Sequence, residues 1–296
     1  MTTYPLIQVD AFTDCPLGGN PCAVLFDTED LTDDEMLSIA REMNLSETAF
    51  IRKTAKGNYA ARYFTPAEEI PFAGHPTIAT VSALIDSQRI ALVGDYSTIT
   101  LEVKIGSIQV EIYATRGVVK QITMTQHKPE FLSMMDPQDV IAVFGLELAH
   151  LIPNVPIQVV STGTPQLMVP LRDLAALARI NLDIPAYFKL RAAAHFFSPH
   201  LFCLQGATPA GNTFARHFGV PPDTPEDPFT GSATGGMAAY LWRYGLIDSP
   251  RFISEQGHWM HRPGQAQVEI IGSREDIQAV KVGGNAVVVL RGELVI

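Results

Sequence analysis

The chain reads Arg62-Tyr-Phe-Thr-Pro66 and then Ala73-Gly-His-Pro-Thr77, and later Arg216-His-Phe-Gly-Val220 and then Glu226-Asp-Pro-Phe-Thr-Gly-Ser-Ala-Thr234. A run of apolar or small residues follows each stretch, Ile78–Leu84 after the first and Gly235–Leu241 after the second. Each stretch predicts a strand, an acidic loop, a small-residue turn and a buried helix. The repeat indicates two similar halves, each with a polar helix start, and one site in the cleft between them.

Composition and charge indicate a globular protein with a sizeable core. The 296 residues are 47% hydrophobic and 18% charged, and the formal net charge is −10. An acidic chain argues against a nucleic-acid partner, although a local site can still bind a small anionic metabolite. No apolar run approaches the roughly 18 residues that would span a membrane, and the N-terminus has no signal-peptide pattern. The three cysteines are too scattered for a disulfide framework, so a cytoplasmic location is expected.

The rest of the pattern predicts many short strands and few helices. Tyr4–Thr13 alternates like a strand, Thr32 and Glu35 form a capping box that opens a helix, and Pro137–Phe144 predicts another helix. One nearly all-apolar helix in each half, with strands on both sides of it in the chain, predicts a curled sheet around a central helix. The boundary between the halves is expected near Gly117.

Glu47 is the first candidate for acid/base chemistry. It stands in Asn44-Leu-Ser-Glu-Thr-Ala-Phe50, between an expected helix and an apolar strand. A carboxyl group flanked by apolar residues can have a raised pKa and act as a general acid or base. The alternative interpretation is an ordinary solvated glutamate in a loop.

The first helix start supplies a second pair of candidates. Gly74 lets a ligand approach the backbone, and the free N–H groups of a helix start bind anions. His75 can hydrogen-bond a substrate or shuttle a proton. The alternative is a first-turn histidine that only helps to cap the helix.

The second helix start offers a matching set. Thr230, Gly231 and Ser232 provide hydroxyls and backbone amides suited to a carboxylate. Asp227 can act as a second acid/base or orient His75. The alternative is an acidic loop with a hydroxyl cap, as many helices have.

Cofactor and metal signatures are missing from the sequence. It has neither a phosphate-binding loop nor a dinucleotide fingerprint, so no cofactor is expected. His258 and His261 have an i, i+3 spacing, but no carboxylate–histidine helix supports a metal there, and no metal is expected. The cysteines lie outside both paired stretches, which favours structural roles.

Several phrases resemble the phenazine-biosynthesis PhzF-like family, and the resemblance spans nearly the whole chain. The phrases are Val9-Asp-Ala-Phe-Thr13, Gly19-Asn-Pro21, Asn44-Leu-Ser-Glu-Thr-Ala-Phe50, Phe64-Thr-Pro66, Gly74-His75, Ser161-Thr-Gly163, Glu226-Asp-Pro-Phe-Thr-Gly-Ser-Ala233, Ser254-Glu-Gln-Gly257 and Arg262-Pro263. His261 stands where the family more often has glycine.

The resemblance implies the α+β, diaminopimelate-epimerase-like fold. That fold has two pseudo-symmetric domains, each a rolled, mostly antiparallel sheet around a central helix, and usually forms a homodimer. Because its last strand returns to the first domain, the expected domains are 1–117 with 286–296, and 118–285, with the active site in the cleft between them.

The resemblance also implies roles for the candidate residues. The family uses a glutamate as proton carrier, which by motif is Glu47, helped by His75 and Asp227. Substrate binding is implied for Asn20, Gly74, Thr230, Gly231 and Ser232. Related epimerases and racemases carry paired cysteines at the two helix starts, where this chain has Ala73 and Thr230, so cysteine-based racemisation is not expected.

The leading hypothesis is a cofactor-independent isomerase that moves a proton within a small carboxylate-bearing substrate. The alternatives are an epimerase or dehydratase of an amino or hydroxy acid, and a non-catalytic small-molecule binder on the same fold. The two helix starts are expected to point at one anion site. A side chain added at Gly231 is expected to block the close approach of that anion.

Overall fold

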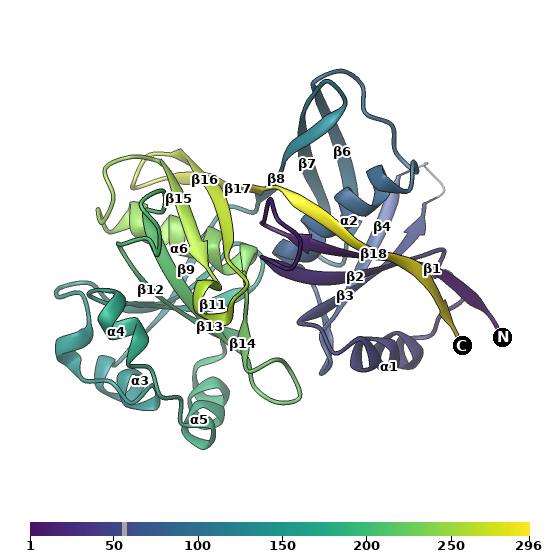
Figure 1. The fold of residues 1–296 in the computed structure, drawn as a ribbon. Coiled ribbons are helices and arrows are strands. Elements are labelled where there is room, and N and C mark those ends of the chain that lie inside the picture. The colour runs from purple at the N-terminus through teal and green to yellow at the C-terminus, as the bar shows by residue number, and fades with distance from the viewer. Residues whose placement is uncertain (55–57) are drawn as a thin grey trace.

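Two curled lobes of β-sheet, each with a helix inside, make up the computed structural model, which describes residues 1–54 and 58–296 (Figure 1). The elements up to the end of the eighth strand are β1 (Thr3–Ala11), β2 (Asn20–Phe26), α1 (Asp33–Met43), β3 (Glu47–Lys53), β4 (Tyr59–Phe64), β5 (Glu69–Ile70), α2 (Gly74–Asp86), β6 (Tyr96–Val103), β7 (Gly106–Thr115) and β8 (Val118–Gln126). We call this set the first repeat.

The second repeat begins after a short connecting strand, β9 (Glu130–Met135). It contains α3 (Pro137–Val143), η1 (Leu148–His150), β10 (Ile157–Ser161), β11 (Pro165–Pro170), α4 (Leu174–Ala178), α5 (Ile184–Ala194), β12 (Ser198–Cys203), β13 (Thr213–Phe218), β14 (Glu226–Asp227), α6 (Gly231–Arg243), β15 (Arg251–Gln256), η2 (His258–Met260), β16 (Gly264–Gly272) and β17 (Ile277–Gly284). The chain ends with β18 (Ala286–Val295).

The strand pairings repeat in the same order in both repeats. In the first, β2 is parallel to β3, β3 is antiparallel to β4, and β4 pairs with both β5 and β6. In the second, β11 is parallel to β12, β12 is antiparallel to β13, and β13 pairs with both β14 and β15. This repetition confirms the predicted pseudo-symmetric α+β fold.

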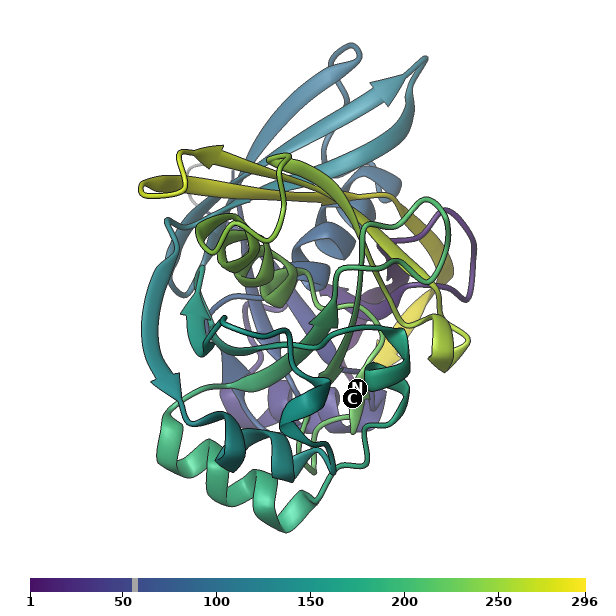
Figure 2. The same ribbon diagram turned by 90° about the vertical axis from the view of Figure 1, so that its left-hand side faces the viewer.

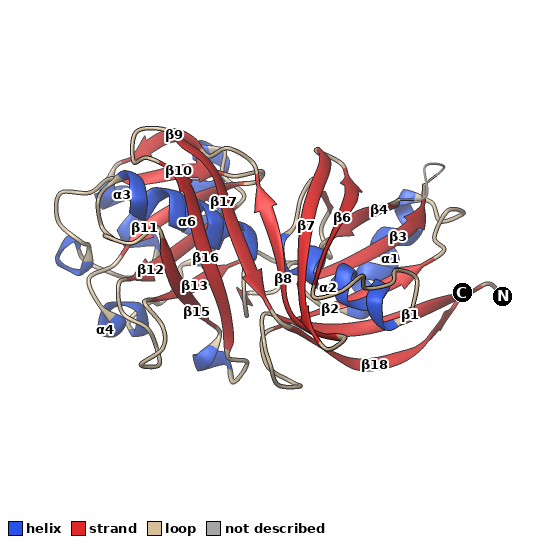
Figure 3. Cartoon of the chain, turned by 90° about the horizontal axis from the view of Figure 1, so that it is seen from above, coloured by secondary structure: helices blue, strands red, loops and turns tan. Residues whose placement is uncertain are grey.

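The two sheets join through one strand pair. β8 pairs with β7 of its own repeat and with β17 of the other, so the ladder runs without a break from lobe to lobe. Seen from above, the lobes meet at β8 and β17 and open away from that line (Figure 3). Because β8 pairs on both sides, the expected domain boundary near Gly117 stays a prediction.

The last strand returns to the first lobe. β18 pairs antiparallel with β1 from Thr3↔Val295 to Ala11↔Ala286. Backbone hydrogen bonds between Thr2 and Ile296 bring the two chain ends side by side (Figures 1 and 2). β1 is therefore bonded on both edges, by β2 and by β18.

The central helices are buried because their sequences are apolar or small on nearly every face. In α2, Ile78, Val81 and Leu84 are fully buried, and each such side chain stabilises the fold by about 2 kcal/mol. α6 has Gly235 and Gly236 in its middle, where strands β10, β11, β16 and β17 pack against the helix. Both helices are 13 residues long and begin in the paired stretches, where buried helices are predicted.

Several elements are missing from the sequence-based prediction. The capping box of Thr32 and Glu35 and the helix at Pro137 are confirmed. Helices α4 and α5 and strand β9 were not predicted. α5 has the start signals of a helix, Asp183 as N-cap and a proline in its first turn, but it lacks a clear apolar stripe.

Within residues 1–54 and 58–296, no helix is long and apolar enough to cross a bilayer.

A glycine pair in α6 gives a test of this packing. An alanine methyl at Gly235 would overlap the side-chain amide of Gln126, which donates to Gly231 O at 2.8 Å. A methyl at the adjacent Gly236 would meet only the flexible Cε of Met168. We expect Gly235→Ala to destabilise the protein by about 1–3 kcal/mol in urea denaturation. Gly236→Ala should be neutral or stabilise by up to about 1 kcal/mol. Equal effects of the two changes would contradict this packing.

Candidate active site

Three ionisable side chains from different elements converge between the lobes. Glu47 is the first residue of β3, His75 lies in the first turn of α2, and Asp227 is the last residue of β14. One side-chain N or O atom from each of the three lies within 4.8 Å of those of the other two. Asp227 thus lies beside Glu47 and His75, which are more than 150 positions away in the chain, and its contact with His75 brings the two paired stretches together.

Asn20 links this cluster to both lobes. Its Nδ2 donates to Oδ1 of Asp227 at 2.8 Å and to the carbonyl of Phe229 at 2.8 Å, and it lies 2.9 Å from Nδ1 of His75. An amide nitrogen carries two hydrogens and so donates to only two of these three acceptors at once, but the contact turns Nδ1 of His75 toward Asn20 and leaves Nε2 on the other side of the ring. That nitrogen lies 3.3 Å from Oε2 of Glu47. Asn20 therefore sets which nitrogen of His75 faces Glu47.

A partly buried ion pair holds the turn that carries Asn20. Arg262 donates to Oδ1 of Asp10 at 2.7 Å, and Asp10 is 1% exposed. The same guanidinium donates to the carbonyls of Gly18 and Gly19 at 2.8 and 3.0 Å. Its planar, forked donors suit such a site better than an ammonium group would. The second repeat thus fixes the backbone just before Asn20.

The starts of α2 and α6 touch. A methyl group on Gly74 would lie 2.5 Å from the backbone nitrogen of Ser232, so only glycine fits there. The N-cap residues, Ala73 and Thr230, make no side-chain cap, and the hydroxyl of Thr230 donates to Asp227 instead. Two uncapped helix starts therefore place partial positive charge at one spot.

The pKa values of the cluster move in opposite directions. Burial raises the pKa of Glu47 well above its ordinary value, and the charges of Asp227 and Asp223 add to the rise. Burial lowers the pKa of His75 to about 4, against the opposing charge of Asp227. The carboxyl group can therefore hold a proton where an exposed glutamate would not, while the imidazole stays neutral.

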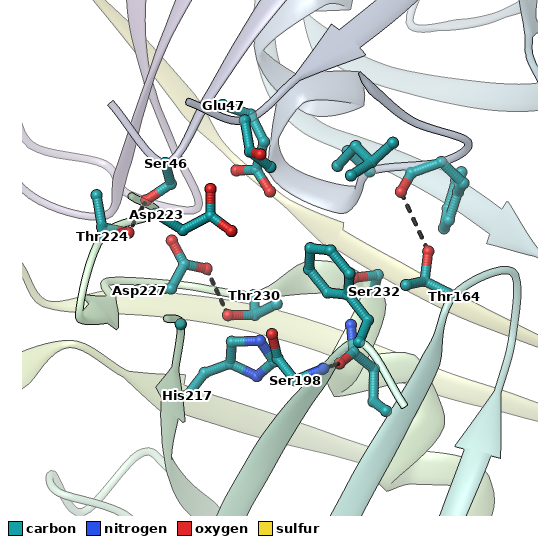
Figure 4. A pocket seen from close by; sticks show the side chains of 17 residues that line it. Ser46, Glu47, Thr164, Ser198, His217, Asp223, Thr224, Asp227, Thr230 and Ser232 are labelled. Atoms are coloured by element: carbon teal, nitrogen blue, oxygen red, sulfur yellow. Dashed lines mark hydrogen bonds between the residues drawn. The ribbon is translucent and has the colours of Figure 1, made fainter. Parts of the chain in front are cut away.

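A small cavity of about 40 Å³ lies against this cluster (Figure 4). Of the predicted residues, Glu47, Asp227, Thr230 and Ser232 line the cavity. Asn20, Gly74, His75 and Gly231 are not among the described residues that line it, although Asn20 donates to Asp227 and Nε2 of His75 lies 3.3 Å from Oε2 of Glu47.

The expectation for Gly231 is wrong. An added side chain there would meet the ring of Phe12 at 2.8 Å rather than a ligand, because this face of the helix start packs against the core. The added atoms would disturb packing instead of blocking an anion.

Other residues of the cavity were not predicted. Asp223, His217, Ser198 and Ser46 also line it. Asp223 lies in the loop between β13 and β14 and reaches the other lobe, where its Oδ1 accepts from Ala67 N at 3.3 Å. Burial raises the pKa of Asp223. Its place in the Pro-rich run just before Asp227 was the one sequence signal that could have indicated it.

A divalent metal could also be held by side chains with the spacing of Glu47, His75 and Asp227. However, both oxygens of Asp227 accept hydrogen bonds, from Asn20 and Thr230, and Nδ1 of His75 faces Asn20. These contacts hold the side chains in a hydrogen-bonded network, which favours acid/base chemistry. That the site binds no metal stays a prediction.

The chain is similar to known proteins over its whole length. The family model "Phenazine biosynthesis-like protein" matches residues 9–292. An uncharacterized isomerase of Clostridium acetobutylicum is 34% identical over 99% of this chain and 98% of its own. The trans-2,3-dihydro-3-hydroxyanthranilate isomerase of Pseudomonas chlororaphis is 33% identical over 98% of this chain and 99% of its own. The crystal structure of a PhzF-family phenazine biosynthesis protein from Bacillus anthracis matches with a TM-score of 0.87 at 29% identity, covering 100% of both chains.

The structure has two lobes, two central helices whose starts touch, and a cluster of ionisable residues in the cleft. It has the diaminopimelate-epimerase-like fold that was predicted from the sequence. The chain belongs to the phenazine biosynthesis-like, or PhzF, protein family. Relatives of about one-third identity are named isomerases, and the prediction that the chain is an isomerase is confirmed at that level.

The raised pKa of Glu47 predicts how stability depends on pH. A folded carboxyl with a raised pKa stabilises the protein while protonated, and this contribution is lost as pH rises through the folded pKa. Glu47→Gln cannot ionise. We expect its free energy of unfolding, relative to wild type, to grow as pH rises above the ordinary glutamate range and then level off. Urea denaturation across pH measures this, with Glu42→Gln at an exposed position of α1 as the control. A difference that shrinks with rising pH would contradict the assignment.

Proposed function

We propose that the chain is a cofactor-independent isomerase that moves a proton within a small carboxylate-bearing substrate, with Glu47 as the proton carrier. The observation that carries this proposal is a carboxyl group of raised pKa, only 14% exposed, that lies 3.3 Å from a neutral histidine and beside two uncapped helix starts. We further propose that it works in the cytoplasm as a homodimer.

The reaction needs only one proton carrier. The Glu47 carboxylate removes a proton from one carbon, and the electrons of that C–H bond form a new double bond. The existing double bond shifts, and the carbon at its far end takes the proton back from Glu47. Atoms and electrons balance without an oxidant or reductant.

Each neighbour of Glu47 has a defined part in this step. Charge that develops on the substrate carboxylate is stabilised by the partial positive charge at the uncapped starts of α2 and α6, whose first-turn N–H groups are already oriented. His75 presents its Nε2 side to Glu47 and lies beside the carboxylate that removes the proton. Asp227 keeps Asn20 and Thr230 in place through hydrogen bonds.

The family relationship suggests the first substrate to test. The Pseudomonas relatives are named for trans-2,3-dihydro-3-hydroxyanthranilate, a ring that carries a carboxylate. The cavity of about 40 Å³ has room for only a few water molecules, so a ring enters only when the lobes separate. Closure then excludes water from the proton transfer.

Two alternatives use the same cleft. An epimerase of the cysteine type would need thiols at the helix starts, where Ala73 and Thr230 stand. A dehydratase would yield a product that has lost water, whereas an isomer keeps the mass of the substrate. Mass spectrometry of the product therefore separates the dehydratase from the proposal, and chiral analysis separates an epimerase.

Glu47→Gln tests the proton carrier directly. We expect turnover of trans-2,3-dihydro-3-hydroxyanthranilate, or of a substrate found by metabolite screening in heavy water, to fall by about 10²–10⁴-fold with binding retained. Glu42→Gln is the control that should keep full activity. A product that keeps the hydrogen of the substrate and takes up no deuterium from heavy water is compatible with the proposal, because an enclosed carboxyl group can return the same proton. Undiminished turnover in Glu47→Gln would disprove it.

Ser232→Ala tests the carboxylate site. The side chain of Ser232 lines the cavity at the start of α6, and one hydrogen bond is worth about 1 kcal/mol. We expect this change to weaken binding of anthranilate, measured by calorimetry, by about fivefold. Ser38→Ala on exposed α1 should leave binding unchanged. Equal affinity in Ser232→Ala and wild type would place the carboxylate elsewhere.

A further inference from the structure

A row of three ionisable residues crosses the second lobe beside the cavity. His200 on β12 pairs in register with His217 on β13, and His217 pairs with Asp227 on β14. Residues directly opposite each other on neighbouring strands share one face of the sheet. The two histidines are in contact, with 3.2 Å between their Nδ1 atoms, and both are buried.

The residues at the equivalent positions of the first lobe do not ionise near neutral pH. There Ala49 on β3 pairs with Tyr63 on β4, and Tyr63 pairs with Ile70 on β5. Tyr63 is fully buried and its hydroxyl contacts Thr77. The fold therefore builds this row without histidine, so His200 and His217 are not required by the scaffold itself.

The contact between the histidines leaves one nitrogen of His217 for the cavity. Nδ1 of His217 faces His200, and the two ring nitrogens point in nearly opposite directions. His217 lines the cavity below Asp227 and Thr230 (Figure 4). Its Nε2 is thus the nitrogen that a ligand can reach.

Two observations decide which nitrogen carries the proton. Only one Nδ1 of the pair can donate to the other. Within the described residues, Nε2 of His200 is buried without a hydrogen-bond partner, and an orphaned N–H there is disfavoured over a bare nitrogen. His200 therefore carries its proton on Nδ1 and donates to His217, which leaves His217 protonated on Nε2. The neighbouring carboxylate of Asp227 also favours an N–H on that side.

We propose that His217 is a specificity-determining residue, whose Nε2–H donates to an acceptor oxygen of the substrate, and that His200 is a positioning residue that holds this tautomer. The cavity wall contains the carboxyl groups of Glu47, Asp223 and Asp227 but no lysine or arginine among the described residues. A neutral N–H donor there selects a substrate with a hydroxyl or carbonyl oxygen away from its carboxylate. This inference rests on the proposed function.

The tautomer can be measured without any ligand. Nitrogen-15 NMR of histidine-labelled protein distinguishes a protonated from a bare ring nitrogen. The expected result is a proton on Nε2 of His217 and on Nδ1 of His200. A proton on Nδ1 of His217 overturns the proposal. His200→Phe should leave His217 a mixture of tautomers, whereas an unchanged His217 spectrum would remove His200 from its role.

Recognition is tested with two probes that differ by one oxygen, 3-hydroxyanthranilate and anthranilate. Wild type should bind the hydroxylated probe about fivefold to tenfold more tightly, the effect of one hydrogen bond. His217→Asn keeps a polar group at the Nδ1 position but loses the donor into the cavity, so the preference should vanish. His217→Gln places a donor near the Nε2 position and should keep part of it.

The possible outcomes separate this proposal from the proposed function. Recognition by His217 is disproved if His217→Asn still prefers the hydroxylated probe, or if the wild-type protein binds both probes equally. If wild type binds neither probe, the proposed substrate class fails, and the tautomer alone then decides the His217 proposal. Circular dichroism of each variant establishes that a lost preference is not lost folding.

Discussion

Crossed hydrogen bonds at the two helix starts are the constraint on which the rest of this structure depends. Asn20, where β2 begins, donates to the carbonyl of Phe229 before α6, and Thr164, just before β11, donates to the carbonyl of Phe72 before α2. Each repeat thus holds the helix start of the other. Glycine at position 74 lets the two backbones touch, and the uncapped amides and the carboxyl groups are gathered as a result. A side chain at that contact would separate them all.

The side chains that face the cavity differ between the two repeats, although the strand pairings of the repeats are the same. The register makes Glu47 equivalent to Ser198, since each begins its strand opposite the same position of a parallel neighbour. The ion pair between an arginine and a glutamate, by contrast, occurs in both repeats, as Arg62–Glu69 and Arg216–Glu226. Residues that hold the loops are thus repeated, while residues that face the cavity have diverged. This pattern suits a reaction in which one lobe carries the proton and the other recognises the substrate.

The sequence predicted what local pattern and repetition encode. The paired stretches identified both central helices and the loops before them, and the family resemblance identified the fold. The sequence did not predict α5, because the apolar residues of this helix form no clear stripe. It also did not predict the roles of His217 and Asp223, because these depend on strand register and on a loop that crosses the cleft. Substrate binding by Asn20 stays a prediction, and only the three-dimensional contacts reveal its hydrogen bonds to Asp227 and Phe229. The catalytic roles of Glu47, His75 and Asp227 stay predictions.

The return of β18 to β1 has a consequence for biosynthesis. The first lobe lacks one edge strand until residues 286–295 leave the ribosome, because β18 follows the strands of the second repeat in the sequence. During translation β1 presents an open edge, which is a template for pairing with other chains. The second repeat can complete its own strand ladder earlier, so the lobe synthesised first is the last to be finished. In the folded protein that edge is closed, and backbone hydrogen bonds between Thr2 and Ile296 tie the two strands together at their far ends.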